Sequence, residues 1–447
     1  MSTISTLRGL ARFDALALTA LIWFLAKFLR YAFPPLFEPL QAFYGVSNTV
    51  IGTAFTGFML VYALMQFPSG LLADRLGSVV VITAGALLAA IGALAVVLEP
   101  PFLALVGAMM LMGAGTGAHK TVAIRLLSRT YPARTGRALG VLDTVGTFGG
   151  VAAPAAVLAV ASVPLLFDPG WRTLFFAAGL VGIVLAGSFA IQVPKRLPGE
   201  TGAVAETDIA SGTETQSETR AEAETGGGTA SESDDDEPAD GNGSVGIRQY
   251  LELFGEWRFS VFVVVTILFS FTYNGVVAFF PLYLTQEAGL DGTTASLLYS
   301  VLFALSLVQL VTGEISDRIG ALPVIVVTQG LATVSLAAFV LLTGTGDPFV
   351  LGATVVAVGI GSHGFRPVRG SYLMSVLPPS IAGGSLGIVR TLLMGAGAVS
   401  PAVVGYLSET VGFRPAFWLL TLSIAVATTL SAVLLVLEPN RSVRGSD

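Results

Sequence analysis

Twelve long apolar runs divide this chain and decide what it can fold into. A helix needs about 20 consecutive apolar residues to cross a hydrocarbon layer of about 30 Å. Lys27 and Arg30 interrupt the first run and no small-residue cleavage site follows it, so we do not expect a cleaved signal peptide. The sequence predicts an all-α membrane protein with twelve transmembrane helices. The expected spans are residues 14–37, 49–71, 78–98, 101–127, 137–160, 172–193, 257–282, 293–314, 322–343, 348–376, 385–407 and 412–437.

Composition agrees with this class and excludes others. Of the 447 residues 12% are charged, and the mean hydropathy is +0.79, whereas a soluble domain has about 25% charged residues. The lack of cysteine excludes disulfides and thiolate metal sites, and two histidines leave little for zinc or haem. No phosphate-binding loop, nucleophile elbow or His-Glu-x-x-His helix occurs. We therefore expect no enzyme activity, cofactor or metal, and the net charge of −6 argues against a nucleic-acid partner.

The charge is unevenly distributed along the chain. Residues 200–240 contain thirteen acidic residues and one base, Arg220, which leaves 22 bases and 16 acids elsewhere. The middle of the surrounding segment 194–256 consists of Gly, Ser, Thr, Ala, Asp and Glu with almost no apolar content, so it cannot bury a core. We expect an N-terminal six-helix half at 1–193, a cytoplasmic and largely disordered linker at 194–256, and a C-terminal six-helix half at 257–447.

Basic residues in the loops set the expected orientation, because Lys and Arg concentrate on the cytoplasmic side of a membrane. With both termini inside, thirteen bases flank the inner ends of the spans and two flank the outer ends. We therefore expect a multi-pass protein of the plasma membrane with both termini in the cytoplasm. The inner residues are Arg8, Arg12, Arg75, Arg129, Arg134, Arg137, Lys195, Arg196, Arg248, Arg258, Arg318, Arg441 and Arg444, and the outer residues are Arg172 and Arg414.

The two halves repeat each other in sequence. Residues 70–77, Gly-Leu-Leu-Ala-Asp-Arg-Leu-Gly, return at 313–320 as Gly-Glu-Ile-Ser-Asp-Arg-Ile-Gly, an offset of 243. Further along, the offset becomes 247, and Pro154 matches Pro401. Parallel six-helix repeats, related by an axis along the membrane normal, describe one transporter architecture.

This pattern resembles the signature of the major facilitator superfamily. The motif lies between the second and third spans, its weaker copy follows the eighth, and a long loop joins the halves. The resemblance implies alternating access, in which two pseudo-symmetric halves rock about one central site lined by the first, fourth, seventh and tenth spans. It also implies that Asp74 lies against the start of the eleventh span and steadies the state closed to the cytoplasm, a contact worth about 0.3–1 kcal/mol.

Both copies of the motif are therefore expected to act in the conformational change. Gly77 and Gly320 should allow tight turns, and Gly70 and Gly313 should permit close helix packing. The loop departs from the family pattern after Gly77, where further basic residues are usual. The expected conformational residues of the motif are Gly70, Asp74, Arg75, Gly77, Gly313, Asp317, Arg318 and Gly320.

Charges inside the spans indicate what is carried. An ionised side chain at mid-membrane costs about 2.5–3.5 kcal/mol even on the lenient insertion scale, so such groups face water, a partner or a substrate. Asp143 is the one acid well inside a span, against seven bases, and this excess indicates an anionic substrate. The bases are Lys27, Arg30, Lys120, Arg125, Arg366, Arg369 and Arg390.

Depth within the spans selects the candidate site. Lys27 and Arg30 lie near the middle of the first span on one face, and His363 has the same spacing to Arg366 in the tenth. His119 matches Arg366 in the repeat, so we expect these two to face each other. Arg125 and Arg369 lie near the inner surface and can snorkel to it. The expected substrate-binding residues are Lys27, Arg30, Tyr31, His119, Lys120, Tyr273, Asn274, His363 and Arg366.

Asp143 and Arg390 are repeat partners near the inner ends of the fifth and eleventh spans. We expect them to form a cytoplasmic salt bridge in the state that is closed on that side. Pairing of Asp143 with Arg125 inside one half is the alternative.

The sequence thus predicts a monomeric secondary transporter in the lipid bilayer for a small anion: an organic acid, a phosphorylated compound or an inorganic anion. Coupling to a proton or cation gradient would run through His119, His363 or Asp143. Efflux of amphipathic compounds is an alternative, although Ala152 and Ala153 stand where the efflux branch of the family has its Gly-Pro pair. A membrane sensor that carries no flux is an alternative of another class.

Overall fold

The computed structural model describes residues 13–161, 166–197, 254–377 and 382–437, which form α-helices joined by turns and short 3₁₀ segments. Twelve helices in these ranges are long and apolar enough to cross a membrane, and this confirms the predicted number of spans. Most of the predicted linker at 194–256 lies outside the described residues. So do five of the arginines behind the expected orientation: Arg8, Arg12, Arg248, Arg441 and Arg444.

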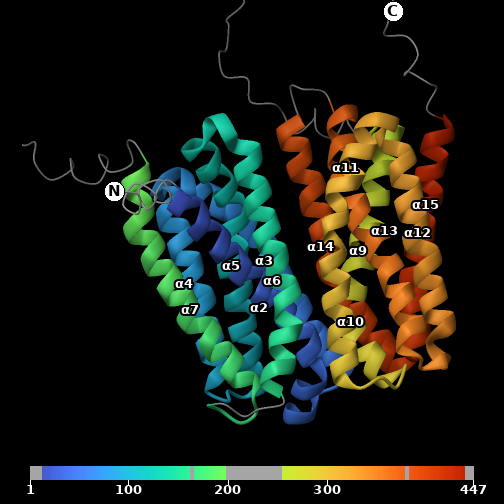
Figure 1. Ribbon diagram of the computed structural model, residues 1–447, viewed down its shortest axis with the longest axis horizontal. Helices are drawn as coiled ribbons and strands as arrows, with labels where there is room; N and C mark the ends of the chain where they lie inside the picture. The colour runs from blue at the N-terminus through green and yellow to red at the C-terminus, as the bar shows by residue number, and fades with distance from the viewer. Residues whose placement is uncertain (1–12, 162–165, 198–253, 378–381, 438–447) are drawn as a thin grey trace, which may run out of the picture.

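Each half supplies six spans (Figure 1). The N-terminal half consists of α2 (Asp14–Tyr44), α3 (Asn48–Leu76), α4 (Ser78–Val97), α5 (Phe102–Thr130), η2 (Pro132–Arg134), α6 (Thr135–Ala161), α7 (Trp171–Gln192) and η3 (Val193–Arg196). The C-terminal half consists of α9 (Trp257–Gln286), α10 (Gly292–Ala304), η4 (Leu305–Leu307), α11 (Val308–Ile319), α12 (Ala321–Leu342), η5 (Thr343–Thr345), α13 (Pro348–Val376), α14 (Ala382–Thr410) and α15 (Phe413–Leu437). The eighth span is interrupted, because η4 separates α10 from α11.

Local chemistry sets several helix ends. Asp291 caps α10 by accepting hydrogen bonds from the Thr294 hydroxyl at 2.7 Å and backbone N–H at 2.9 Å, and these bonds hold the pKa of the Asp291 carboxyl below its usual value. Asp347 caps α13 in the same way, by accepting from the backbone N–H of Phe349 at 2.8 Å. Gly45 ends α2 with a φ of 64°, a conformation that costs glycine little.

The molecule has two unlike ends. We call the end at which α2 begins the Asp14 side and the end at which α2 finishes the Tyr44 side. In Figure 1 the two halves converge at the Tyr44 side, at the bottom of the view, and stand apart at the Asp14 side. Contacts between the halves are made mainly by α3 with α14, α6 with α10, and α2 with α9.

Backbones meet directly on the Tyr44 side, in a contact that we call the Tyr44-side seam and define by Asn48, Gly52 and Thr56 of α3 with Pro401 and Gly405 of α14. A Cβ on Gly52 would lie 2.5 Å from the Pro401 carbonyl oxygen, and one on Gly405 would lie 2.4 Å from that of Asn48. The Thr56 hydroxyl accepts a hydrogen bond from the backbone N–H of Ala402 at 2.9 Å. The molecule is therefore closed on this side.

Two of the four motif glycines behave as predicted. Gly77 and Gly320 have φ values of 86° and 90° and form the turns after α3 and α11, which confirms the tight-turn prediction. The close-packing prediction for Gly70 and Gly313 is wrong, because an added Cβ at either position would meet no atom within 4 Å. The close approaches between helices occur instead at glycines outside the motif, such as Gly52 and Gly405.

Candidate functional site

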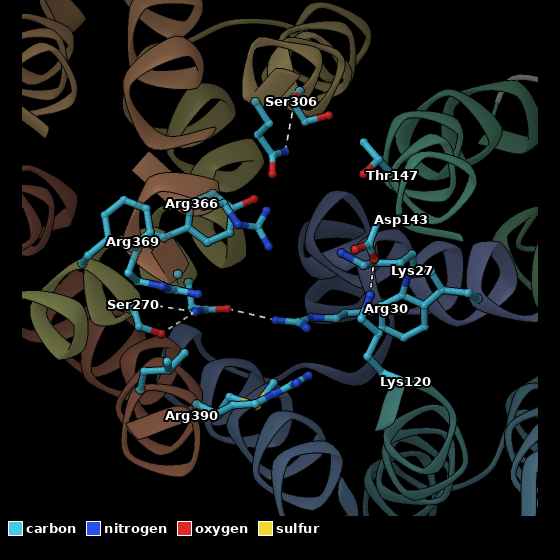
Figure 2. Close-up of a pocket in the computed structure, with 18 of the residues that line it drawn as sticks. Lys27, Arg30, Lys120, Asp143, Thr147, Ser270, Ser306, Arg366, Arg369 and Arg390 are labelled. Carbon is cyan, nitrogen blue, oxygen red and sulfur yellow. Dashed lines mark hydrogen bonds and ion pairs between the residues drawn. The ribbon is translucent and has the colours of Figure 1, made fainter. Parts of the chain in front are cut away.

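A cavity of about 560 Å³ lies between the two halves. Its lining runs from the middle of α2 and α9 toward the Asp14 side, and both halves contribute (Figure 2). The polar and aromatic residues of the lining are Trp23, Lys27, Arg30, Tyr31, Tyr62, Lys120, Asp143, Thr144, Thr147, Phe269, Ser270, Tyr273, Asn274, Ser306, Gln309, Arg366, Arg369 and Arg390.

Positive charge dominates this lining. Among the described residues six bases and one carboxylate face the cavity. The N-terminal half supplies Lys27, Arg30, Lys120 and the carboxylate, Asp143, and the C-terminal half supplies Arg366, Arg369 and Arg390. Such a surplus in a low-dielectric surrounding is costly unless a counter-charge arrives. The cavity is therefore suited to hold an anion.

The α2 cations are arranged by the aromatic residues around them. Lys27 Nζ lies 5.4 Å from the ring centroid of Trp23 and 5.5 Å from that of Tyr31. The guanidinium of Arg30 lies 5.2 Å from the Tyr62 ring and donates a hydrogen bond from Nη2 to Asn274 Oδ1 at 2.9 Å. Because Asn274 belongs to α9, this bond joins the two halves. Cation–π contacts hold the side chains in place but do not cancel their charge.

The cations of the C-terminal half are less constrained by polar groups. Arg366 lies 5.4 Å from the Tyr273 ring and Arg369 lies 6.0 Å from the Phe365 ring. Neither these two arginines nor Arg390 forms an ion pair with a carboxylate in the part of the chain that the structure describes. Figure 2 shows Arg366 reaching into the cavity from the side opposite Lys27 and Arg30.

Asp143 pairs with a residue that the sequence did not indicate. Its carboxylate forms an ion pair with Lys120, and the two side chains are 63% and 14% exposed, respectively. The alternative pairing with Arg125 is wrong for this conformation, because Arg125 forms an ion pair with Asp74. The expected bridge from Asp143 to Arg390 belongs to the opposite state, closed on the Asp14 side, and stays a prediction.

Both histidines lie outside the cavity lining, which corrects their expected place. His119 is 2% exposed, bonds the Thr19 carbonyl oxygen through Nε2 at 3.0 Å and stacks on Trp23. It therefore faces α2 within its own half and does not face Arg366. His363 is 1% exposed and packs beside the rings of Tyr273 and Phe303, and neither of its ring nitrogens has a hydrogen-bond partner among the described residues.

Other predicted site residues do line the cavity: Lys27, Arg30, Tyr31, Lys120, Tyr273, Asn274 and Arg366. The sequence predicted Arg369 near the inner surface and Arg390 only in a gate, yet both face the cavity. Arg366 and Arg369 have the same three-residue spacing as Lys27 and Arg30, and this spacing could have indicated Arg369. The smaller polar residues Thr144, Thr147, Ser270, Ser306 and Gln309 carried no comparable signal.

The two motif copies differ in their ion pairs. Asp74 contacts Arg125 of α5, whereas Arg318 bonds Glu314 one turn earlier in its own helix at 2.5 Å. Asp317 forms no ion pair with another described residue, and it matches Asp74 in the repeat. Within the described ranges no cluster of three or more His, Asp or Glu residues is suited to a metal ion.

Twelve spans in two repeated halves around a polar cavity are the architecture of one class of membrane transporters. The sequence profile of the Major Facilitator Superfamily matches residues 19–383 and 264–447. The chain belongs to this family, and the prediction made from the repeated motif is confirmed. It is a multi-pass membrane transporter and not an enzyme, in line with its named relatives.

Those relatives differ in what their names state. A putative proline/betaine transporter of Staphylococcus haemolyticus is 27% identical over 96% of this chain and 87% of its own length. A D-galactonate transporter of Escherichia coli is 23% identical over 90% of each chain.

Solved structures agree on the fold. A bacterial homologue of the human lysosomal transporter Spinster, in an inward-facing and unoccupied conformation, has a TM-score of 0.69 and 17% identity, with 95% of each chain covered. A D-xylose–proton symporter has a TM-score of 0.71 and 15% identity over 94% of this chain and 97% of its own.

Proposed function

We propose that this protein is a secondary transporter that carries a small anionic solute across the plasma membrane by alternating access. The observation behind this proposal is the set of six bases around the cavity, against one carboxylate in the described lining. A cavity with walls of one charge attracts ligands of the opposite sign and concentrates them. The structure then corresponds to the state in which the site is open to the Asp14 side.

The named relatives agree with an acidic group in the substrate. Proline, betaine and galactonate each carry a carboxylate, and galactonate is an anion. A quaternary ammonium group such as that of betaine is recognised by free aromatic faces. Here Lys27 and Arg30 already lie over Trp23, Tyr31 and Tyr62. The carboxylate is therefore the part of these ligands that this cavity is suited to bind.

We assign substrate contacts to the cations and hydrogen-bonding groups that meet in the cavity. Lys27, Arg30 and Arg366 bind the negative charge of the ligand, and Tyr31, Tyr273 and Asn274 position the rest of it. We assign the coupling of transport to a proton gradient to Asp143, because it is the one carboxylate of the described lining and Arg stays charged throughout.

The Asp14 side is assigned to the cytoplasm. The described members of the inner set of bases lie at helix ends on this side, for example Arg75, Arg134 and Lys195, and Arg172 and Arg414 lie on the other. This asymmetry follows the positive-inside rule and supports our assignment of both termini to the cytoplasm. One chain supplies both halves of the pathway, so we assign the monomer as the functional unit.

Closure on the Asp14 side would bring α6 and α14 together. In this change the Asp143 carboxylate would break its ion pair with Lys120 and form one with Arg390. Arg390 lines the same cavity and has no carboxylate partner among the described residues. The new bridge would stabilise the state that is open to the Tyr44 side.

Thermal-shift screening of the purified full chain tests the anion assignment. A ligand stabilises the folded protein by RT ln(1 + [L]/Kd). Carboxylates, sugar acids and phosphates are expected to raise the melting temperature, and lipophilic cations are not. Stabilisation by lipophilic cations alone would instead support efflux of amphipathic compounds and would overturn the proposal.

A further inference from the structure

We propose that the substrate carries at least two negative charges, and that each half of the protein binds one of them. One anionic group would be held by Lys27 and Arg30 of α2, and the other by Arg366, Arg369 and Arg390 of α13 and α14. This inference rests on the proposed anion transport and specifies the valence of the anion.

The N-terminal half offers one unneutralised pair of cations. Lys120 is excluded from this pair, because it is already bound to Asp143. Lys27 and Arg30 have aromatic and amide neighbours but no ion pair with a described carboxylate. Their spacing on α2 directs both toward the same part of the cavity, where one carboxylate or phosphate can contact both.

The C-terminal half offers a second, separate group of cations. Arg366 and Arg369 are spaced as Lys27 and Arg30 are, and Arg390 approaches from α14. The guanidinium groups of Arg366 and Arg369 rest on aromatic rings, so their N–H donors are free for an anion. A single small anion bound at α2 would leave all three charges uncompensated.

The two groups repel each other across the cavity. Lys27 lies close enough to Arg366 for the two charges to interact. Closing the cavity shortens this separation and removes water, which strengthens the repulsion. A ligand with a negative charge at each end attracts both groups of cations and draws the halves together. A monovalent anion neutralises only one group of cations, so the positive charge of the other group still opposes closure.

The size of the cavity allows such a ligand. Its volume of about 560 Å³ lies within the range of about 300–1,000 Å³ that is usual for small-molecule sites. Thr147 and Ser306 also line the cavity and offer hydroxyl groups to the uncharged part of the ligand.

A charge-graded ligand series provides the test. Butyrate, succinate and tricarballylate have similar carbon chains and carry one, two and three carboxylates, and sulfate and nitrate form an inorganic pair. With the purified full chain we expect the apparent Kd from thermal shift to fall by at least about tenfold from one charge to two. Equal stabilisation by butyrate and succinate, and by nitrate and sulfate, would overturn the divalent proposal while leaving anion transport intact. Stabilisation by none of the five would overturn both.

Two variants locate the charges. Arg30→Gln and Arg366→Gln each remove one cation from one of the two groups, so each should reduce the preference for succinate over butyrate to less than about threefold. Arg366→Lys keeps the charge and should retain most of the preference. Arg134→Gln removes an exposed charge outside the cavity lining and is the matched control. If Arg366→Gln weakens butyrate and succinate by the same factor in a variant whose melting temperature without ligand is unchanged, the proposal is wrong.

Discussion

The Tyr44-side seam and the cavity on the Asp14 side are the two ends of one pathway, and they differ in what their closure requires. In the seam, Gly52 and Gly405 bring the backbones of α3 and α14 into direct contact. In the cavity, long cationic side chains keep the walls apart and no glycine pair joins α6 to α14 in the described residues. One end thus closes by shape, and the other requires a counter-charge. A substrate that supplies this charge would drive closure on its own side.

The largest expected effect comes from breaking the fit of the seam. Gly52→Leu places its Cβ against the Pro401 carbonyl oxygen, and backbone atoms cannot move aside as a flexible side chain does. Overpacking costs about 1–3 kcal/mol and should shift the population away from the present state by about 5- to 150-fold. The chain has no cysteine, so labelling of a single Thr147→Cys reporter from the Asp14 side measures this shift.

Gly107→Leu is the control for this change, since an added Cβ there meets nothing within 4 Å. Equal labelling rates in Gly52→Leu and Gly107→Leu would show that the seam does not control the conformational change.

Exchanging Asp143 and Arg390 tests the salt bridge that we expect between them when the Asp14 side is closed. Asp143→Asn and Arg390→Gln should each slow transport, because the closed state loses its bridge, and the double variant Asp143→Arg/Arg390→Asp should restore part of the rate. Coupling energies between contacting residues are about 0.5–3 kcal/mol, which corresponds to a rescue of about 2- to 150-fold. Uptake into proteoliposomes gives the rates, and additive losses in the double variant would exclude the bridge.

The pH dependence of transport tests whether proton coupling depends on Asp143 or on a histidine. Asp143→Asn removes the one carboxylate of the described lining and should leave transport nearly independent of pH. His363→Leu should keep the pH dependence of the unmodified protein, because His363 lies outside the cavity among aromatic rings. Uptake at a series of external pH values checks both. A flat profile in His363→Leu, with a normal one in Asp143→Asn, would assign coupling to the histidine instead.

The smallest effect is expected at a motif glycine. Gly70 has open space around its Cα, so Gly70→Ala introduces no clash and gains helix propensity. We expect a gain of up to about 1 kcal/mol in stability, seen as a small rise in melting temperature. A fall would mean that Gly70 packs closely in another state of the transport cycle.

The span number, the repeated halves and the turns at Gly77 and Gly320 were predictable, because they depend on local apolar content and on backbone conformation. The depth of a charge along a helix was predictable for the same reason. The direction of each side chain was not. His119 and Lys120 are neighbours at the same depth, yet His119 packs on Trp23 while Lys120 enters the cavity. Tertiary packing decides which face of a helix is turned inward, and a single sequence with all-round apolar helices does not record it.

Ion pairs were unpredictable for a related reason. Asp143 has Lys120, Arg125 and Arg390 at plausible depths, and the choice of Lys120 depends on how α5 and α6 rotate against each other. The packing of glycines was unpredictable in the same way. Gly70 stands in a recognisable pattern, yet an added Cβ there would meet no atom within 4 Å, whereas Gly52 stands in no pattern and lies where α3 directly contacts α14.

Flux in proteoliposomes tests the central claim most directly, namely that the bases around the cavity bind the anion that is carried. The anion that stabilises the purified protein most would be supplied as a radiolabelled tracer to liposomes that contain the full chain. We predict saturable uptake that Arg366→Gln reduces by at least about tenfold and Arg134→Gln leaves unchanged. Saturable flux of lipophilic cations without flux of any anion would contradict the account, as would binding of the anion with no flux.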